Sequence, residues 1–196
     1  MAAQGQLFRS NTLERRKFLG YGLAAATLAA GGRALAEAPA SLIADNGPRS
    51  VAFHNLHTGE SLNAIYWDDG RYVPDALQAV NKVLRDYRSG DEHDMDPRLL
   101  DLLNTVHGKV DARSPFQVIS GYRSPKTNAM MHEHSHGVAS GSLHMQGMAI
   151  DVRVEGVQLD HLHKAALDLG RGGVGLYPVS NFVHMDVGRV RRWYGA

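Results

Sequence analysis

The strongest constraint on the fold comes from two short apolar segments, residues 147–154 and 181–187, each of which carries a polar residue in its interior. Their length and their content of β-branched residues predict strands. In a strand, side chains two positions apart share a face. Asp151 therefore points away from the apolar side chains next to it, and His184 shares its face with Asp186. If the two strands are neighbours, Asp151 and His184 lie side by side.

A third polar group, His144, lies just before the first of these strands. Two imidazoles and one carboxylate are a ligand set of catalytic zinc sites, which keep a fourth position open for water. A carboxylate inside an apolar strand is costly to bury without a partner. For Asp151 that partner is either a metal ion shared with His144 and His184 or a cation, such as Arg153 or Arg123, in a structural ion pair.

Length and composition limit the class of protein. With 196 residues and 43% hydrophobic content, the chain can bury one core but is short for two domains. A formal charge of +1, with no basic run interleaved with aromatic residues, argues against a nucleic-acid partner. The chain has no cysteine, which excludes disulfides, thiolate zinc ribbons and cysteine nucleophiles. Any metal must therefore be held by nitrogen and oxygen ligands.

The first 36 residues have the features of an export signal. An arginine pair, Arg15 and Arg16, precedes a weakly apolar run at 20–30 that is too short to cross a bilayer as a stable helix. Ala34 and Ala36 then form a small-x-small cleavage motif. The segment resembles a bacterial twin-arginine signal, which implies a periplasmic protein cleaved after Ala36, with a retained N-terminal anchor as the alternative.

Residues 37–49 are polar and aperiodic and are interpreted as a linker, and residues 50–196 as a single domain without stable membrane insertion. Nothing in the sequence requires more than a monomer. Strands and helices are partly segregated, so we expect an α+β fold, with a small, mostly antiparallel central sheet and flanking helices. The predicted strands are 50–57, 61–67, 116–122, 147–154, 172–177 and 181–187, and the predicted helices begin at Pro74 and span 97–110 and 157–169.

Three finer expectations accompany this fold. Asp96 is a suitable N-cap for the helix at 97–110. His161 and His163 are expected on the solvent side of the helix at 157–169. Residues 189–194 are expected to pack as a closing strand rather than to contact an anionic polymer.

Four motifs together resemble a known family. They are Ser-Gly-Tyr-Arg-Ser-Pro-Lys-Thr-Asn at 120–128, His-Met-Gln-Gly-Met-Ala-Ile-Asp at 144–151, Gly-Gly-Val-Gly-Leu-Tyr-Pro at 172–178 and Asn-Phe-Val-His-Met-Asp-Val-Gly at 181–188. The arginine and histidine motifs are similar to the signature of the LAS zinc peptidases. The whole set resembles the MepK-type periplasmic murein endopeptidases over about residues 51–193. This resemblance implies the LAS or hedgehog-like peptidase fold.

The resemblance also implies roles for individual residues. His144, Asp151 and His184 would hold one Zn²⁺, leaving a position for water. Such a zinc ion lowers the pKa of its bound water and polarises the scissile carbonyl. Arg123 matches the family arginine that reaches the substrate carbonyl or its developing oxyanion, with a structural salt bridge as the alternative.

The general base is where this chain departs from the family pattern. Many LAS enzymes place an acidic residue three positions before the last zinc histidine, or a histidine two before it, whereas this chain has Asn181 and Phe182. Neither side chain accepts a proton usefully. Asp186 is the remaining carboxylate on the face of His184, and we expect it to guide water or protonate the leaving amine. It also fits a partner that orients a metal-bound imidazole.

Three further features belong to the implied site. Ser142 and Tyr122 are expected to support the substrate pocket without taking part in the chemistry. The segment His132-Glu133-His134-Ser135-His136 is interpreted as a loop that either lines the cleft or is solvated. Because alternating histidines chelate metals, this loop also leaves open a metal-carrier protein.

The function that these observations favour is hydrolysis of peptidoglycan peptide crosslinks by a zinc endopeptidase, with bonds between two diaminopimelate residues as the expected target. A D,D- or L,D-carboxypeptidase acting on stem peptides would share every expected zinc ligand. An inactive zinc-bearing wall-binding module and a periplasmic metal carrier are also compatible with the sequence.

Overall fold

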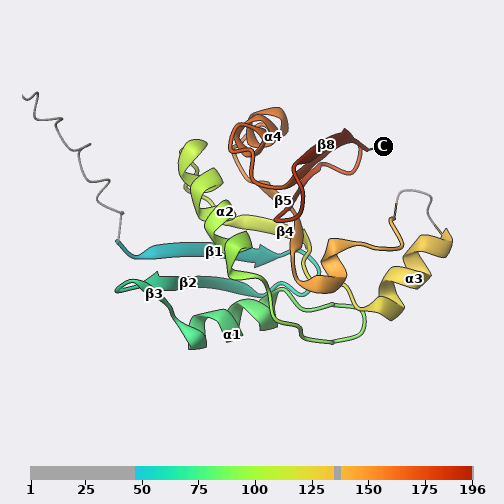
Figure 1. Cartoon of the computed structure of the whole chain (residues 1–196), viewed down its shortest axis with the longest axis horizontal. Coiled ribbons are helices and arrows are strands. Elements are labelled where there is room, and N and C mark those ends of the chain that lie inside the picture. Colours follow the sequence, from blue (N-terminus) through green and yellow to red (C-terminus); the bar gives the residue numbers. More distant parts are fainter. Residues whose placement is uncertain (1–46, 135–137, 196) are drawn as a thin grey trace, which may run out of the picture. The chain divides into compact units, whose positions relative to one another are not determined.

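The computed structural model describes residues 47–134 and 138–195, so the expected export signal at 1–36 lies outside the described residues. Figure 1 shows the described elements. The strands are β1 (Arg49–Asn55), β2 (Ser61–Asp68), β3 (Arg71–Tyr72), β4 (Phe116–Ser120), β5 (Ala149–Val154), β6 (Gly173–Tyr177), β7 (Phe182–Asp186) and β8 (Arg191–Tyr194). The helices are α1 (Pro74–Val83), α2 (Pro97–Lys109), α3 (Pro125–His134), the 3-10 turn η1 (Leu143–Gln146) and α4 (Leu159–Leu167).

The described strands form one sheet in the order β3-β2-β1-β4-β5-β7-β6-β8. Neighbouring strands are antiparallel except for the pairs β1–β4 and β6–β8, which are parallel. The expected α+β fold with a mostly antiparallel sheet is therefore confirmed. Two of the three candidate metal ligands lie on the neighbouring strands β5 and β7.

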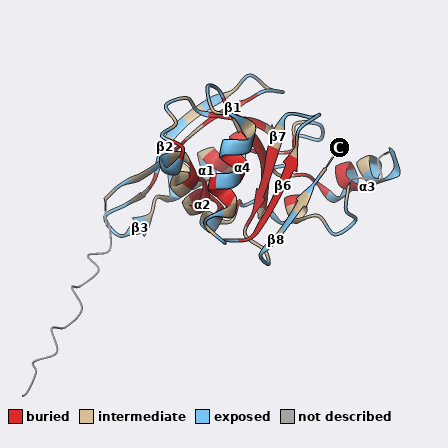
Figure 2. Ribbon diagram, turned by 90° about the horizontal axis from the view of Figure 1, so that it is seen from above, coloured by how far each residue is buried: buried red, intermediate tan, exposed pale blue. Residues whose placement is uncertain are grey.

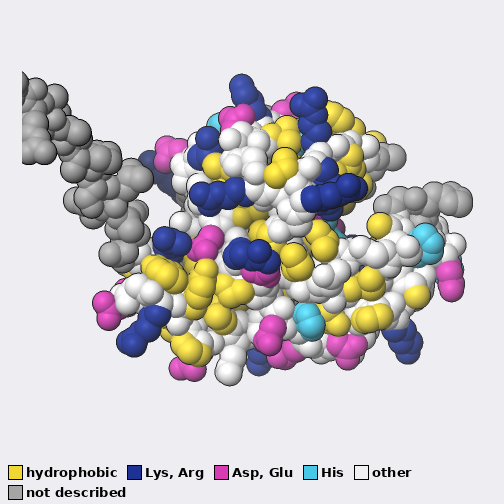
Figure 3. All heavy atoms as spheres, viewed as in Figure 1, with side chains coloured by type: hydrophobic (Ala, Val, Ile, Leu, Met, Phe, Trp, Pro, Cys, Tyr) yellow, Lys and Arg dark blue, Asp and Glu magenta, His cyan; other side chains and the backbone are white. Residues whose placement is uncertain are grey.

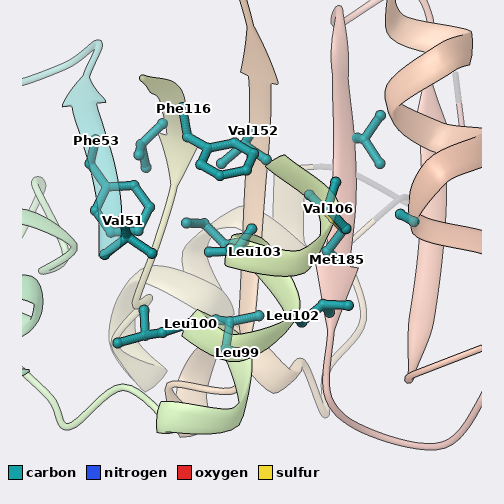
Figure 4. Packing of buried hydrophobic residues seen from close by; sticks show 14 of the residues in the cluster. Val51, Phe53, Leu99, Leu100, Leu102, Leu103, Val106, Phe116, Val152 and Met185 are labelled. Carbon is teal, nitrogen blue, oxygen red and sulfur yellow. The ribbon is translucent and has the colours of Figure 1, made fainter. Parts of the chain in front are cut away.

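The core lies between the sheet and the helices α2 and α4. Leu99, Leu103 and Val106 of α2 are fully buried, as their helical spacing predicts, and they point at the strands in Figure 4. On the sheet side they meet apolar residues of several strands, among them Val152 and Met185. Because side chains alternate along a strand, the helices cover the face of Val152, and the polar residues of β5 and β7 lie on the other face.

The helix boundaries follow local signals. Asp96 caps α2 as expected, since its side chain accepts a hydrogen bond from the backbone nitrogen of Arg98. Apolar residues at helical spacing run from Leu77 to Tyr87, but α1 ends at Val83, and the chain after it turns into a loop.

Three details of the remaining chain differ from, or add to, the expectations. Residues 132–134, which were expected to lie in a loop, form the end of α3, so that interpretation was wrong. The sequence signal for the start of this helix is Ser124 followed by a proline, and Ser124 Oγ accepts a hydrogen bond from Thr127 N. His163 is 5% exposed and stacks edge-on with Tyr194, so its expected solvent position was also wrong. The expected closing strand is present as β8, which covers the edge of the sheet beside the buried strands β6 and β7 (Figure 2).

The closing strand β8 contacts His163 from outside α4. A helix read in isolation has one apolar face, and His163 lies beside it rather than on it. Tyr194 of β8 contacts the imidazole edge-on, with the ring centroids 5.6 Å apart, and the period of the helix alone does not indicate this contact.

Gly147, which lies between η1 and β5, has a left-handed backbone conformation. It ends η1 in the left-handed region at φ 65°, and its carbonyl oxygen accepts a hydrogen bond from Asp96 N. A Cβ atom at this position would overlap the carbonyl group of Asp94. The glycine is required because it lets η1 pass close to the loop before α2.

The substitution Gly147→Ala is therefore expected to lower the free energy of unfolding by more than the backbone cost of about 1–3 kcal/mol that a left-handed residue carries. Gly156→Ala is the matched control, since Gly156 has φ 81° but open space where its Cβ would be. Urea unfolding of both variants measures the difference. Equal losses would mean that the contact with Asp94 adds nothing.

No helix among the described residues is long and apolar enough to cross a membrane. On the face shown in Figure 3, basic and acidic side chains are interspersed, without a patch of one sign. This agrees with the small formal charge of the chain.

Candidate metal centre

The register of β5 and β7 brings two of the three candidate metal ligands together. Asp151 of β5 pairs directly with His184 of the antiparallel strand β7. His144 comes from η1, whose first turn is capped by Ser142 through a hydrogen bond from His144 N to Ser142 Oγ. All three side chains are at most 8% exposed. The juxtaposition expected from alternating side chains is confirmed.

The donor atoms are spaced as one metal ion requires. His184 Nδ1 lies 2.9 Å from Asp151 Oδ1 and 3.3 Å from His144 Nε2. His144 Nε2 is also 3.3 Å from Asp151 Oδ2. Tetrahedral zinc bonds of about 2.0–2.1 Å place neighbouring ligands about 3.3 Å apart. Two imidazole nitrogens and a carboxylate with these separations fit a single divalent cation, and the three residues form the one such group among the described residues.

The second nitrogen of each imidazole is already bound. His144 Nδ1 donates to the carbonyl oxygen of Gly121 at 2.7 Å, which leaves the lone pair on Nε2, the nitrogen that faces the other two donors. His184 Nε2 lies 3.0 Å from Asp186 Oδ2, which leaves Nδ1 to face Asp151. Partners of this kind fix the tautomer and ring orientation of metal-bound histidines. Both imidazoles are therefore preset to present the correct nitrogen.

Asp186 is fully buried, and both of its oxygens have partners. Oδ1 accepts hydrogen bonds from Gly173 N, Gly188 N and Arg191 Nη1, while Oδ2 faces His184 and accepts from Arg191 Nη2 at 2.6 Å. Burial by itself raises the pKa of Asp186, but the contacts with His184 and Arg191 hold it well below its usual range. This environment favours a carboxylate that orients His184 over one that exchanges protons with substrate.

Arg123 lies in the wall of the same site and is 7% exposed. Its Nη2 is 3.8 Å from Asp151 Oδ2, and its Nη1 donates to Asn128 Oδ1 at 3.2 Å. The Nε group has no hydrogen-bond partner among the described residues. Burial lowers the pKa of Arg123 from its usual value, and the positive charge of Arg88 acts in the same direction. The guanidinium thus keeps an N–H group free for a hydrogen bond beside the three candidate metal ligands.

An open cleft of about 800 Å³ leads from the surface to the donor set. Ser142, Arg123 and all three candidate ligands line it. Tyr122 does not line it, because its ring stacks on His93 with the centroids 4.7 Å apart. The structure therefore brings together every expected site residue on this cleft except Tyr122 and the buried Asp186, which reaches it through His184.

The histidines of α3 lie apart from this centre. His132 Nδ1 bonds to the Val138 carbonyl oxygen at 2.6 Å, and His134 Nδ1 bonds to the Met130 carbonyl oxygen at 2.7 Å. Neither residue lines the cleft, and His136 lies outside the described residues. The wall nearest to them is apolar and includes Met131 and Val138.

Two aromatic residues at the site were not expected from the sequence. The ring of Trp193 in β8 lies 5.0 Å from the ring of His184 and donates through Nε1 to Tyr177 Oη at 2.8 Å. Gly175, which pairs with both His184 and Trp193, provides the space, since a Cβ atom there would overlap the indole. The two glycines in the Gly-Val-Gly strand were the signal available for this close packing.

The protonation of His184 gives a testable pH dependence. Burial by itself lowers the pKa of His184, but hydrogen bonds with Asp151 and Asp186 raise it to about 9 in the metal-free protein. A metal ion needs the unprotonated nitrogen, so binding must displace this proton. Metal affinity is therefore expected to rise about tenfold per pH unit up to pH 9 and then to level off.

The same shift fixes the sign for stability. A histidine whose pKa is raised in the folded state stabilises the metal-free fold at pH values below its unfolded pKa of about 6.5, and this contribution is lost as the pH rises through 9.

Titration calorimetry with Zn²⁺ in buffers of different ionisation enthalpy measures the proton that metal binding releases from His184. Affinity that does not change between pH 6 and pH 8 would contradict the prediction.

Two oriented imidazoles and a carboxylate, which lie beside a buried arginine and line an open cleft, fit a hydrolase whose chemistry depends on a metal ion. The family model described as "Peptidoglycan L,D-endopeptidase MepK" matches residues 43–193. This chain belongs to that family of peptidases, as the four sequence motifs indicated.

Individual relatives agree with this assignment. The chain is 42% identical to the peptidoglycan L,D-endopeptidase MepK of Escherichia coli over 180 residues, which cover 91% of this chain and 96% of the relative. It is 37% identical to the probable peptidoglycan L,D-endopeptidase MepK of Haemophilus influenzae over 182 residues, covering 92% and 96%. No solved structure matches the chain.

Proposed function

We propose that this protein is a zinc-dependent L,D-endopeptidase that hydrolyses amide bonds in peptidoglycan crosslinks, with bonds between two diaminopimelate residues as the target. The observation that carries the proposal is the His144, Asp151 and His184 donor set, buried at the floor of a cleft in a chain of the MepK family. Both relatives are named as peptidoglycan L,D-endopeptidases, and this supports peptidoglycan as the substrate of this protein.

The choice of Zn²⁺ follows from the donors. Two neutral imidazoles and one carboxylate suit zinc, whereas Mg²⁺ and Ca²⁺ prefer oxygen ligands. Once bound, zinc supplies a water of lowered pKa and polarises the carbonyl group to be attacked.

The residues of this chain then do the positioning. We assign to Arg123 the stabilisation of charge on the carbonyl oxygen of the substrate. Its Nη2 lies 3.8 Å from Asp151 Oδ2, which places the guanidinium beside the candidate metal ligands, and its Nε has no partner among the described residues and can donate a hydrogen bond. Asp186 keeps His184 in the tautomer that presents Nδ1. Trp193 packs on the His184 ring and limits its rotation.

The residues that line the cleft limit the choice of a general base. Apart from Asp151, no carboxylate among the described residues lines it. A carboxylate general base from the cleft wall is therefore not assigned, which agrees with Asn181 and Phe182 at the positions where many LAS enzymes have such a base.

Digestion of intact sacculi tests the function. The purified protein, loaded with Zn²⁺, is incubated with sacculi and separately with isolated stem pentapeptide, and the products are identified by mass spectrometry. An endopeptidase releases monomers from crosslinked dimers and leaves the pentapeptide intact. Loss of a terminal residue from the pentapeptide would instead indicate a carboxypeptidase, and binding to sacculi without products would indicate a wall-binding module.

We also propose that residues 1–36 direct export to the periplasm by the twin-arginine route, since peptidoglycan lies outside the cytoplasm. The mature protein is then expected to begin at Glu37. N-terminal sequencing of protein recovered from the periplasm tests the cleavage, and replacement of both Arg15 and Arg16 by lysine is expected to block export.

A further inference from the structure

We propose that Arg88, at the wall of the cleft, binds a free carboxylate of the substrate peptide and thereby selects acidic peptides. This inference rests on the proposed function and names the chemical feature by which the same site would recognise its substrate. It concerns a residue outside the four family motifs.

The charges that line the cleft leave Arg88 without a protein partner. Of the three arginines in the lining, Arg191 is paired with Asp186 at 2.6 Å, and Arg123 lies 3.8 Å from Asp151. Arg88 is exposed, and within the described residues it forms no ion pair. Its positive charge in the cleft is therefore available to an anion from outside.

The guanidinium of Arg88 is held in place before any substrate arrives. It stacks on the ring of Tyr87 at 4.2 Å, and Tyr87 in turn stacks on His57 with the ring centroids 3.8 Å apart. His57 Nε2 donates to the carbonyl oxygen of Ile119 at 3.0 Å, which anchors the stack to the end of β4. A stacked guanidinium uses its face for packing and keeps its N–H edge for an acceptor, so less side-chain entropy is lost on binding.

A single buried carboxylate connects Arg88 to Arg123. Asp86 is 1% exposed; its Oδ1 accepts a hydrogen bond from Arg88 N at 2.9 Å. Its Oδ2 accepts from Ser124 N at 3.0 Å and from Ser124 Oγ at 2.8 Å, and Ser124 directly follows Arg123. The backbone positions of the two arginines are thus fixed relative to one another, as recognition of two groups on one peptide requires.

The proposed substrate carries a suitable anion. A diaminopimelate residue that is linked through one of its carboxyl groups keeps the other, which is ionised at neutral pH because carboxyl pKa values lie near 4. Guanidinium and carboxylate form paired, charge-assisted hydrogen bonds. Arg88 would bind this carboxylate while Arg123 faces the carbonyl group that is cleaved.

Matched peptides test the inference in the Zn²⁺-loaded full chain. Two crosslinked peptide dimers are compared, one with free carboxyl groups on diaminopimelate and one with these groups converted to carboxamides. The wild type is expected to show a KM about tenfold lower for the acid, and Arg88→Gln is expected to raise the KM for the acid alone by about tenfold, with kcat nearly unchanged. Arg88→Lys keeps the charge and is expected to recover part of the loss.

Arg113→Gln is the control, because Arg113 is exposed and does not line the cleft. It should leave both KM values unchanged. Equal KM values for acid and amide in the wild type, or an equal effect of Arg88→Gln on both, would overturn the inference.

A binding measurement separates this inference from the proposed function. Calorimetric titration with uncrosslinked stem peptide, as acid and as amide, needs no turnover. If the wild type cleaves neither dimer, the proposed function fails. Tighter binding of the acid that depends on Arg88 would still support the inference, and binding without that preference would overturn it.

Discussion

Replacing His144 by alanine is expected to abolish both tight metal binding and hydrolysis. Its Nε2 lies 3.3 Å from the nearest donors of both Asp151 and His184, so its loss leaves two donors and a second open position. Two ligands do not hold a zinc ion in the open four-coordinate arrangement of catalytic sites. Metal content after dialysis, measured by mass spectrometry, and crosslink cleavage are the two readouts.

Thermal unfolding supplies a third readout and the control. A ligand that binds only the folded state stabilises it, so Zn²⁺ should raise the Tm of the wild type and not that of His144→Ala. His161→Ala is the matched control, since His161 is exposed on α4 and does not line the cleft. Full metal content in His144→Ala would remove this centre from the mechanism and favour a carrier site elsewhere in the chain.

Replacing Asp186 by asparagine is expected to weaken metal binding by about 10–100-fold, as loss of a partner of a metal-bound histidine does. An amide at this position would place an N–H donor against either Arg191 or the backbone donors of Gly173 and Gly188. When the amide nitrogen takes the place of Oδ2, His184 would also lose the acceptor that fixes its Nε2 proton. Activity should therefore recover as the Zn²⁺ concentration is raised, which a series of metal titrations measures.

The opposite result would restore Asp186 as a proton-transferring residue. In that case Asp186→Asn would keep normal metal affinity and remain inactive at every metal concentration. Arg191→Gln serves as the control, because it removes the ion pair of Asp186 but leaves the contact of 3.0 Å with His184. Its metal affinity should fall less than that of Asp186→Asn.

The position of the candidate metal centre could be predicted from local pattern because strand geometry is regular. A side-chain period of two places Asp151 and His184 on the faces where the structure has them, and the apolar residues between them decide which face meets the helices. His144 was predictable from its position before the same strand. The sequence did not show that β5 and β7 are adjacent in the sheet, so this was assumed, and their antiparallel pairing confirms it.

Other parts of the site depend on contacts between distant segments. Tyr122 is next to Arg123 in the sequence, yet its ring turns to His93, outside the cleft. Trp193 reaches His184 because β8 adds to β6, and the charge of Arg88 reaches the cleft through its stack on Tyr87. None of these positions follows from spacing along the chain.

What the sequence by itself determined, then, is the type of fold, the three candidate metal ligands and the family, because side-chain alternation, turn residues and motif spacing are local properties. Tertiary structure alone decided how each donor is oriented and what surrounds it. The carbonyl oxygen of Gly121 and the carboxylate of Asp186 select the nitrogen that each imidazole presents. Hydrogen bonds of this kind form only when separate elements meet, since their strength depends on distances and burial that no single segment sets.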